Sequence, residues 1–473
     1  MNRKTLHTLS LFSLTMITVG SVDSIRNLPA TAIFGSQLIS FFILGALFFL
    51  IPTALVSAEL ASGWPKQGGV YVWVKEAFGK DMGFLAIWLQ WVENVFYYPV
   101  LLMFVAGTIG YMIAPSLASN PYFLCSIIVI CFWGATLLNI FGMKASSFFS
   151  SLCALCGLLL PMLLIIGCGA KWLLAGNPIE VSLDFKSILP HWHDTSIWVS
   201  LTGVMLSLCG VEIATVHAND VKDPQSTFPK ALAYSAVIII ATLIFGSLAI
   251  AMVLPSKDIN LVAGIMQAFT AFFAKYHALW LMPWVALMLV LGGAGTMNNW
   301  IIAPIKGLLV AVQDMHWNTP LAKTNKEGAP TLMLVIQAII VTCLSSLLLF
   351  FPSVNGSYWF LTVLAAQLYM IMYIIMFAAV VKLRISKKDV VRPFKIPGGI
   401  WGLSFVAAMG IVGTLVTFFV GFIPPLGINV GNEVVYDCLL VLGLLTMCLP
   451  PLLVALKRNK KSSLSLIGEL DAA

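Results

Sequence analysis

The sequence predicts an all-α integral membrane protein whose chain crosses the bilayer twelve times. Hydrophobic residues make up 60% of its 473 residues and charged residues only 10%, whereas soluble domains carry about 25% charged residues. The mean hydropathy of +0.98 agrees with this. Apolar runs of at least about 20 residues, the length that spans a bilayer as a helix, recur along the whole chain.

The twelve runs are separated by short polar connections. We expect the spans near 6–34, 37–61, 83–113, 121–142, 147–174, 196–217, 229–254, 277–312, 330–352, 357–384, 400–424 and 433–456. An even number of spans places both termini on the same side of the membrane.

The basic residues indicate which side that is. Most of the 26 Lys and Arg fall in connections on the side of the termini, and only Lys171, Lys186, Lys257 and Lys275 fall on the other. Because Lys and Arg accumulate in cytoplasmic connections, we expect cytoplasmic termini. The same bias explains the net charge of +7 without a nucleic-acid partner. Apart from its small-molecule substrate, we expect the protein to contact membrane lipid.

Several function classes are excluded by what these connections lack. The sequence has no G-x-x-x-x-G-K-[ST] phosphate-binding loop and no connection long enough for a nucleotide-binding domain, which argues against ATP-driven transport. Cys153 and Cys156 have a metal-like C-x-x-C spacing, but no second pair or His lies nearby, so we expect buried apolar thiols. We expect no enzyme activity, no catalytic residue, no metal and no cofactor.

Two spans contain interruptions typical of transporters. The first is "VGSVDSIRNLP" (Val19–Pro29), in which Gly, Ser, Asp and Pro all disfavour a continuous helix. The second is "LSLCGVEIATVHAND" (Leu206–Asp220) in the sixth span. Matching breaks five spans apart predict two five-helix repeats related by inversion, over 1–174 and 196–385. Two further helices over 400–457 and a short cytoplasmic tail over 458–473 complete the chain.

Unwound helices expose backbone groups at membrane depth, and these need polar partners. Freed N–H groups at the start of a resumed helix suit a carboxylate, and freed carbonyls suit an ammonium group. A zwitterionic amino acid offers both. The expected substrate-binding residues at the two breaks are Ser21, Asp23, Ser24, Ile25, Arg26, Cys209, Gly210 and Val211.

Asp23 and Arg26 admit two interpretations. They are three residues apart, so they could form a local ion pair that neutralises itself and shapes the break. Alternatively, Arg26 receives a substrate carboxylate while Asp23 receives an ammonium group or a proton. The two interpretations are compatible, because substrate could intervene between the partners.

Other polar residues in the spans are candidates for the same site. Glu93 is unfavourable in lipid, so it faces the interior or carries a proton, and Tyr97 follows it by one turn. Each also has a structural interpretation, as a hydrogen-bonding or packing residue. Asn298 follows a run of small residues and could contact substrate or a gate.

The sequence resembles the amino acid–polyamine–organocation (APC) superfamily, and within it the bacterial glutamate/γ-aminobutyrate antiporters. The stretches that carry the resemblance are "QGGVYVWVKEAFG" (Gln67–Gly79), "GVEIATVHANDVKDPQSTFPKAL" (Gly210–Leu232), "WIIAPIKGLLVAVQD" (Trp300–Asp314) with "NTPLAKTNKEGAP" (Asn318–Pro330), and "RPFKIPGG" (Arg392–Gly399). The resemblance implies a LeuT-like inverted repeat in the bacterial inner membrane, working by alternating access. It also implies that Glu212 links the substrate site to the cytoplasmic gate or carries a proton. From the residues themselves, we expect His217, at the inner end of the sixth span, to form a gate hydrogen bond or to titrate near neutral pH. Lys306 either forms an inner-gate ion pair or extends its ammonium group to the membrane interface.

The sequence departs from this superfamily in its first break. Many relatives carry Gly-Ser-Gly where Val22, Asp23 and Ser24 stand here. Leu206 replaces the aromatic residue that stacks on guanidinium in arginine/agmatine exchangers, and the tail is shorter than a C-terminal plug. We therefore expect an antiporter or proton-coupled permease for an acidic or neutral amino acid. The alternatives are a cationic amino acid or polyamine transporter, and a non-transporting amino-acid sensor.

Overall fold

The computed structural model describes residues 10–66, 68–141, 157, 159–190, 198–214, 224–316, 319–425 and 427–470, and these residues form helices joined by turns and loops, with no strand among them. The α-helices and two short helical turns that matter below are α1 (Leu11–Val22), η1 (Ile25–Asn27), α2 (Leu28–Ala32), α3 (Leu38–Gly45), η3 (Ala46–Leu50), α4 (Ile51–Gly63), α5 (Val70–Phe78), α6 (Lys80–Ile113), α7 (Pro121–Phe141), α9 (Leu160–Leu174), α10 (Phe185–Ile188), α12 (Ser200–Ser207), α13 (Val211–Ala214), α14 (Pro224–Val253), α15 (Gly264–Lys275), α16 (Met282–Asp314), α17 (Thr331–Ser345), α18 (Val354–Ser386), α19 (Gly399–Val420) and α20 (Glu433–Leu470).

Nine helical stretches within the described residues are long and apolar enough to cross a bilayer. They are Gly35–Gly63, Lys80–Ile113, Pro121–Phe141, Lys230–Val253, Leu279–Asn298, Thr331–Leu349, Val354–Ser386, Gly399–Val420 and Glu433–Leu456. The other three expected spans, near 6–34, 147–174 and 196–217, are broken into short helices or lie partly outside the described residues. The all-helical membrane class is thus confirmed.

Both predicted helix breaks are present. Helix α1 ends at Val22, and Asp23 and Ser24 are extended before η1 begins at Ile25. Helix α12 ends at Ser207, and Gly210 takes a φ of +110° before α13 begins. Glycine suits this conformation because a Cβ would strain the backbone.

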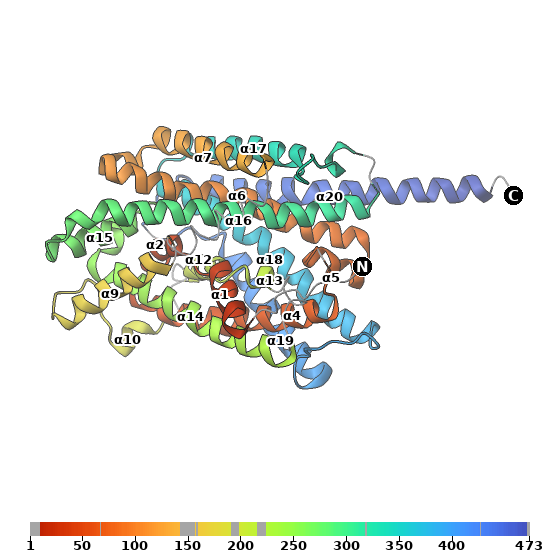
Figure 1. Ribbon diagram of the computed structural model, residues 1–473, viewed down its shortest axis with the longest axis horizontal. Coiled ribbons are helices and arrows are strands. Elements are labelled where there is room, and N and C mark those ends of the chain that lie inside the picture. The colour runs from red at the N-terminus through yellow and green to blue at the C-terminus, as the bar shows by residue number, and fades with distance from the viewer. Residues whose placement is uncertain are drawn as a thin grey trace.

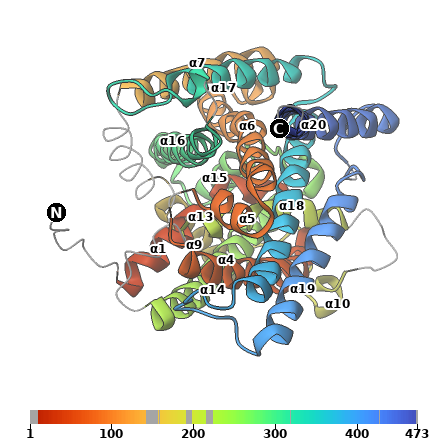
Figure 2. The ribbon, with the colours of Figure 1, turned by 90° about the vertical axis from the view of Figure 1, so that its right-hand side faces the viewer.

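Three long helices form the centre of the bundle. Helix α6 packs against both α16 and α18, and Figure 2 shows it between them. Helices α7 and α17 pack together as an outer layer along one side (Figures 1 and 2). The broken helices and α14 lie on the side of α6 away from α7 and α17 (Figure 2). Residues of both breaks line one cavity together with residues of α6, α16 and α18.

Polar contacts join the helices at one end of the bundle. Glu59 of α4 is buried and accepts hydrogen bonds from Arg384 of α18, one of them at 2.7 Å. Asp314, at the end of α16 beyond its candidate span, accepts from the Tyr71 hydroxyl and pairs with Lys75 of α5 at 2.9 Å. The hydrogen bonds from Tyr71 and Lys75 hold the pKa of Asp314 below its usual value of 3.8. These contacts tie α4 to α18 and α5 to α16.

Helix α20 runs on well past its candidate span. It continues to Leu470, so the predicted polar tail is helical where it is described. Figure 1 shows this end of α20 projecting beyond the rest of the bundle.

Candidate functional site

A cavity lies where the two helix breaks meet α6, α16 and α18. It is small, and its lining combines charged, hydroxyl and aromatic side chains. Of the residues expected at a substrate site, seven line it: Ser21, Asp23, Ser24, Arg26, Glu93, Tyr97 and Cys209. The two breaks are in close contact there, because a Cβ added to Gly210 would lie 2.8 Å from the carbonyl oxygen of Ser21.

Arg26 is the cation of this cavity. Its side chain is only 2% exposed, and its Cζ lies 4.0 Å from the centre of the Tyr97 ring. Tyr358 of α18 also interacts with the guanidinium. Within the described residues Arg26 forms no ion pair, and its Nε has no hydrogen-bond partner. A buried guanidinium that forms no close ion pair is costly, so a ligand carboxylate placed against Arg26 would be favoured.

Asp23 does not neutralise Arg26. Its Oδ2 accepts a hydrogen bond of 2.8 Å from the Thr242 hydroxyl of α14, while its buried Oδ1 has no hydrogen-bond partner among the described residues. The extended backbone at Asp23 and Ser24 removes the helical turn that would bring residues three apart together. The interpretation as a self-neutralising pair is therefore wrong for this conformation.

Glu93 and Tyr97 lie on one face of α6. They are four residues apart, which places them one turn apart on a helix. Glu93 is buried and accepts a hydrogen bond of 2.8 Å from the Asn94 side chain. The Tyr97 ring lies 5.7 Å from that of Trp300 on α16, so the two aromatic rings form one wall of the cavity.

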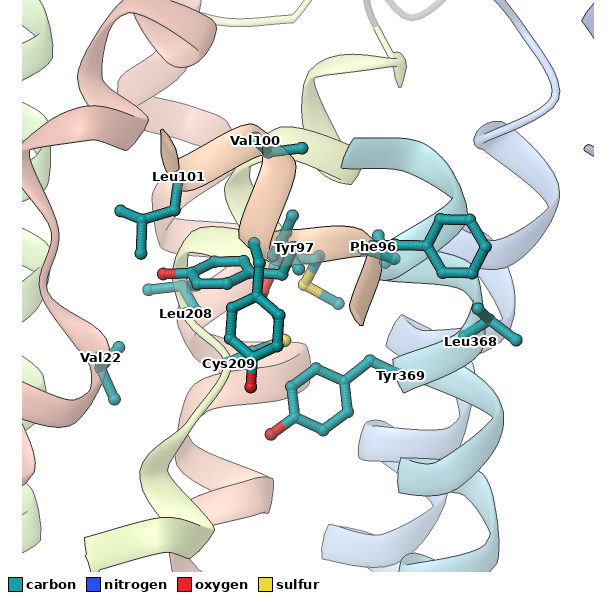
Figure 3. Close-up of a cluster of buried hydrophobic side chains, with 14 of the residues drawn as sticks. Val22, Phe96, Tyr97, Val100, Leu101, Leu208, Cys209, Leu368 and Tyr369 are labelled. Carbon is teal, nitrogen blue, oxygen red and sulfur yellow. Dashed lines mark hydrogen bonds between the residues drawn. The ribbon is translucent and has the colours of Figure 1, made fainter. Parts of the chain in front are cut away.

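Glu212, directly after the second break, lies in a cluster of hydroxyl and amide donors. It accepts hydrogen bonds from Tyr369 and, at 2.7 Å, from Tyr373, both on α18. Gln90 of α6 donates at 3.3 Å, and the Tyr373 hydroxyl also accepts from the N–H of Gly210. Since Tyr369 lines the cavity, it connects the cavity to this carboxylate. Figure 3 shows the side chains of Tyr97, Cys209 and Tyr369 close to one another, each from a different part of the chain.

The remaining expected site residues fall in several places. Ile25 lines a second, smaller cavity beside the first. Val211 is buried beyond the break, and Asn298 accepts a hydrogen bond of 2.5 Å from Asn139 of α7. Lys306 is exposed and forms no ion pair with any described residue. His217 lies outside the described residues.

The family resemblance implies that the tenth expected span, which is α18, lies beside the substrate, but the sequence analysis named no residue of this helix as a site candidate. Tyr369 lines the cavity, and Tyr358 and Tyr373 contact Arg26 and Glu212, yet none was expected at the site. Trp300 and Thr296 of α16 also line it. The sequence gives only a weak indication that these tyrosines belong to the site, since a tyrosine in an apolar span is also a common packing residue.

The cavity therefore presents one guanidinium and two carboxylates that form no ion pair with one another among the described residues. Arg26 can donate to a carboxylate, and Asp23 or Glu93 can accept from an ammonium group. This arrangement suits a small zwitterion that bridges opposite charges.

The chain is similar to known membrane transporters along most of its length. The family model described as amino acid permease matches residues 9–444. An uncharacterized transporter of Legionella pneumophila is 42% identical over 96% of this chain and 97% of its own length. A glutamate/gamma-aminobutyrate antiporter of Lactococcus lactis is 27% identical over 98% of this chain and 92% of its own. A probable agmatine/putrescine antiporter of the same species is 22% identical over 84% of each chain.

Proposed function

Because the chain belongs to the amino acid permease family, we propose that it is a secondary active amino-acid transporter, an antiporter or proton-coupled permease that works by alternating access. The favoured substrate is an acidic or neutral amino acid. It binds in the small cavity between the two helix breaks.

The observation that carries this proposal is the state of Arg26. A guanidinium that is 2% exposed and has no ion-pair partner among the described residues invites a carboxylate from outside the chain. The unpartnered Oδ1 of Asp23 offers a place for the ammonium group. The names of the glutamate/gamma-aminobutyrate antiporters support amino-acid exchange, and both compounds named are carboxylates with an amine.

We further propose twelve spans in a LeuT-like arrangement, with five helices over 1–174, five inverted over 196–385, and two more over 400–457. The two breaks support this, because they fall in the first and sixth expected spans and meet in one cavity. The charge bias of the connections supports cytoplasmic termini. Bacterial relatives support a place in the inner membrane.

Glu212 is the proposed link between substrate and the cytoplasmic gate. Its hydrogen bonds to Tyr369 and Tyr373 support this role, because they connect the cavity, the second break and α18. Movement of any one of these elements changes the partners of the carboxylate. His217 and Lys306 remain proposed gate residues.

A second candidate is a transporter of cationic amino acids or polyamines. Asp23 and Glu93 support it, since two carboxylates line the cavity with a single cation. The relative named as a probable agmatine/putrescine antiporter also supports it. Under this alternative Arg26 would repel the substrate, which is why we rank it second.

Counterflow into proteoliposomes tests the proposal. Vesicles loaded with unlabelled substrate receive a panel of radiolabelled acidic, neutral and cationic amino acids and polyamines, with and without a pH gradient. We expect accumulation of acidic or neutral amino acids. Uptake of cations alone would establish the second candidate, and binding without uptake would indicate a sensor.

A further inference from the structure

Two adjacent tyrosines of α6 hold Trp300, which is a cavity residue of α16. The Tyr97 ring lies 5.7 Å from the Trp300 ring, and the Tyr98 hydroxyl donates a hydrogen bond of 3.0 Å to the Trp300 carbonyl. Tyr97 lines the cavity, whereas Tyr98 does not line it and is buried with its ring 5.0 Å from that of Phe132 on α7. Helix α6 therefore contacts both the side chain and the backbone of the same cavity residue.

The carbonyl of Trp300 needs a donor from outside its own helix because of a proline. Pro304 lies inside α16, four residues after Trp300. A proline has no N–H, so it cannot make the hydrogen bond that the carbonyl four residues earlier normally accepts. The Tyr98 hydroxyl takes the place of this donor. Without it, the carbonyl would lie unpaired between packed helices at membrane depth, which is unfavourable.

Helix α6 makes a second link of the same kind with a different helix. The Nε1 of Trp88 donates a hydrogen bond of 2.8 Å to the carbonyl of Met447 in α20, and Pro451 follows Met447 by four residues. Trp88 does not line the cavity. The recurrence supports the interpretation that these side chains compensate for the prolines, and Trp88 offers a matched control away from the site.

The position of the Trp300 ring affects both helix breaks. A Cβ added to Gly210 would lie 3.2 Å from the Cζ2 and Cη2 atoms of Trp300, so the ring rests directly against the second break. The Tyr97 ring beside it carries the guanidinium of Arg26, which belongs to the first break. A shift of the α16 backbone at Pro304 would move the Trp300 ring relative to both contacts and change the wall of the cavity.

We infer that Tyr98 is a positioning residue of the transport site. Its hydroxyl holds the backbone carbonyl that Pro304 leaves free, and in this way it fixes the Trp300 ring against Tyr97 and Gly210. Tyr98 acts on the substrate only through Trp300. This inference rests on the proposed function, because it assigns Tyr98 a role in the cavity where the substrate binds.

Two substitutions separate this role from simple packing. Tyr98→Phe removes only the hydroxyl group, so the carbonyl of Trp300 loses its donor. Pro304→Ala restores an N–H that can donate to the same carbonyl within the helix. The effect of Tyr98→Phe should therefore appear when Pro304 is present and disappear in the Pro304→Ala background, which a double-mutant cycle measures.

Counterflow into proteoliposomes gives the half-saturating concentration and the maximum rate for each variant. The probe is whichever radiolabelled compound of the panel described above the unaltered protein accumulates most, beginning with glutamate, alanine and leucine. Loss of a partner for a buried acceptor changes an equilibrium on the order of 10-fold. Tyr98→Phe should therefore raise the half-saturating concentration by about that factor with little change in the maximum rate.

Thermal unfolding in detergent distinguishes this role from a structural one. Trp88→Phe breaks the corresponding link to α20, so it should lower the thermal midpoint and leave the half-saturating concentration unchanged. An unchanged half-saturating concentration in Tyr98→Phe would make Tyr98 a structural residue. An equal effect of Tyr98→Phe with Pro304 and with alanine at that position would refute the role of the proline. Both results would leave the proposed function standing, whereas absence of counterflow for the whole panel would overturn it and this inference together.

Discussion

Replacement of Arg26 by methionine should separate substrate binding from folding. The side chain is buried, stacks on Tyr97 at 4.0 Å and forms no ion pair among the described residues. A hydrogen bond to a charged group contributes about 1.5–3 kcal/mol, so loss of the carboxylate contact should weaken substrate affinity roughly 10- to 100-fold. The fold loses a cation–π contact but also loses an unpaired buried charge.

The second part of this prediction concerns stability. Because the two effects on the fold oppose each other, the Arg26→Met protein should unfold at the same temperature as the unaltered protein or higher. Arg384→Met is the matched control, since Arg384 is also an arginine within a helix but pairs with the buried Glu59. Its loss leaves the Glu59 carboxylate with only the longer contact of 3.7 Å to Arg392 and the hydrogen bond from the Ile396 N–H, so it should cost about 3 kcal/mol.

Substrate affinity from competition in counterflow and thermal unfolding in detergent give the two readouts. The expected pattern is weak affinity with intact stability for Arg26→Met, and reduced stability for Arg384→Met. An unchanged affinity together with a loss of stability as large as that of Arg384→Met would refute the reasoning. Arg26 would then be a structural residue.

Three further predictions concern the break and the contacts at the end of the bundle. Gly210→Ala places a Cβ at a φ of +110° and close to a backbone carbonyl, so it should cost about 1–3 kcal/mol in unfolding free energy; an unaltered thermal midpoint would contradict this. Glu59→Gln leaves Arg384 with a weaker partner and should lower the thermal midpoint, whereas Glu76→Gln, at a long and more exposed contact, should have little effect. The lowered pKa of Asp314 means that its contribution to stability is present above pH 3.8 and is lost as the pH falls through the lower, folded-state value. Asp314→Asn should therefore reduce stability at pH 7 by about 0.5–1 kcal/mol and have less effect in acid, and an equal effect at both pH values would exclude this linkage.

Much of the candidate site could be predicted because its signals are local. A Gly, Ser, Asp or Pro in an apolar span disfavours the helix wherever that span packs, so both breaks could be located from the residues alone. Glu93 and Tyr97 are likewise conspicuous, since they fall on one face of a helix by their spacing.

The pairing of charges could not be predicted in this way. Asp23 and Arg26 are three residues apart, and a continuous helix would have joined them. The extended backbone at the break instead directs Asp23 to Thr242 on α14 and Arg26 to Tyr97 on α6. The three-residue spacing predicts an ion pair between Asp23 and Arg26, but the extended backbone of the break keeps these two side chains from pairing.

Three properties could be determined from the sequence by itself: that the chain is a membrane protein, at which residues its helices are interrupted, and which charged residues lie at those interruptions. These follow from composition and from interactions within a few residues along the chain. Only the tertiary structure decided that α18 supplies tyrosines to Glu212, and that Arg26 lies on the Tyr97 ring without an ion-pair partner among the described residues. The physical reason is that these contacts join residues far apart in the chain. They depend on how each helix is rotated about its axis relative to its neighbours. In a span that is apolar on nearly every face, the sequence pattern does not indicate this rotation.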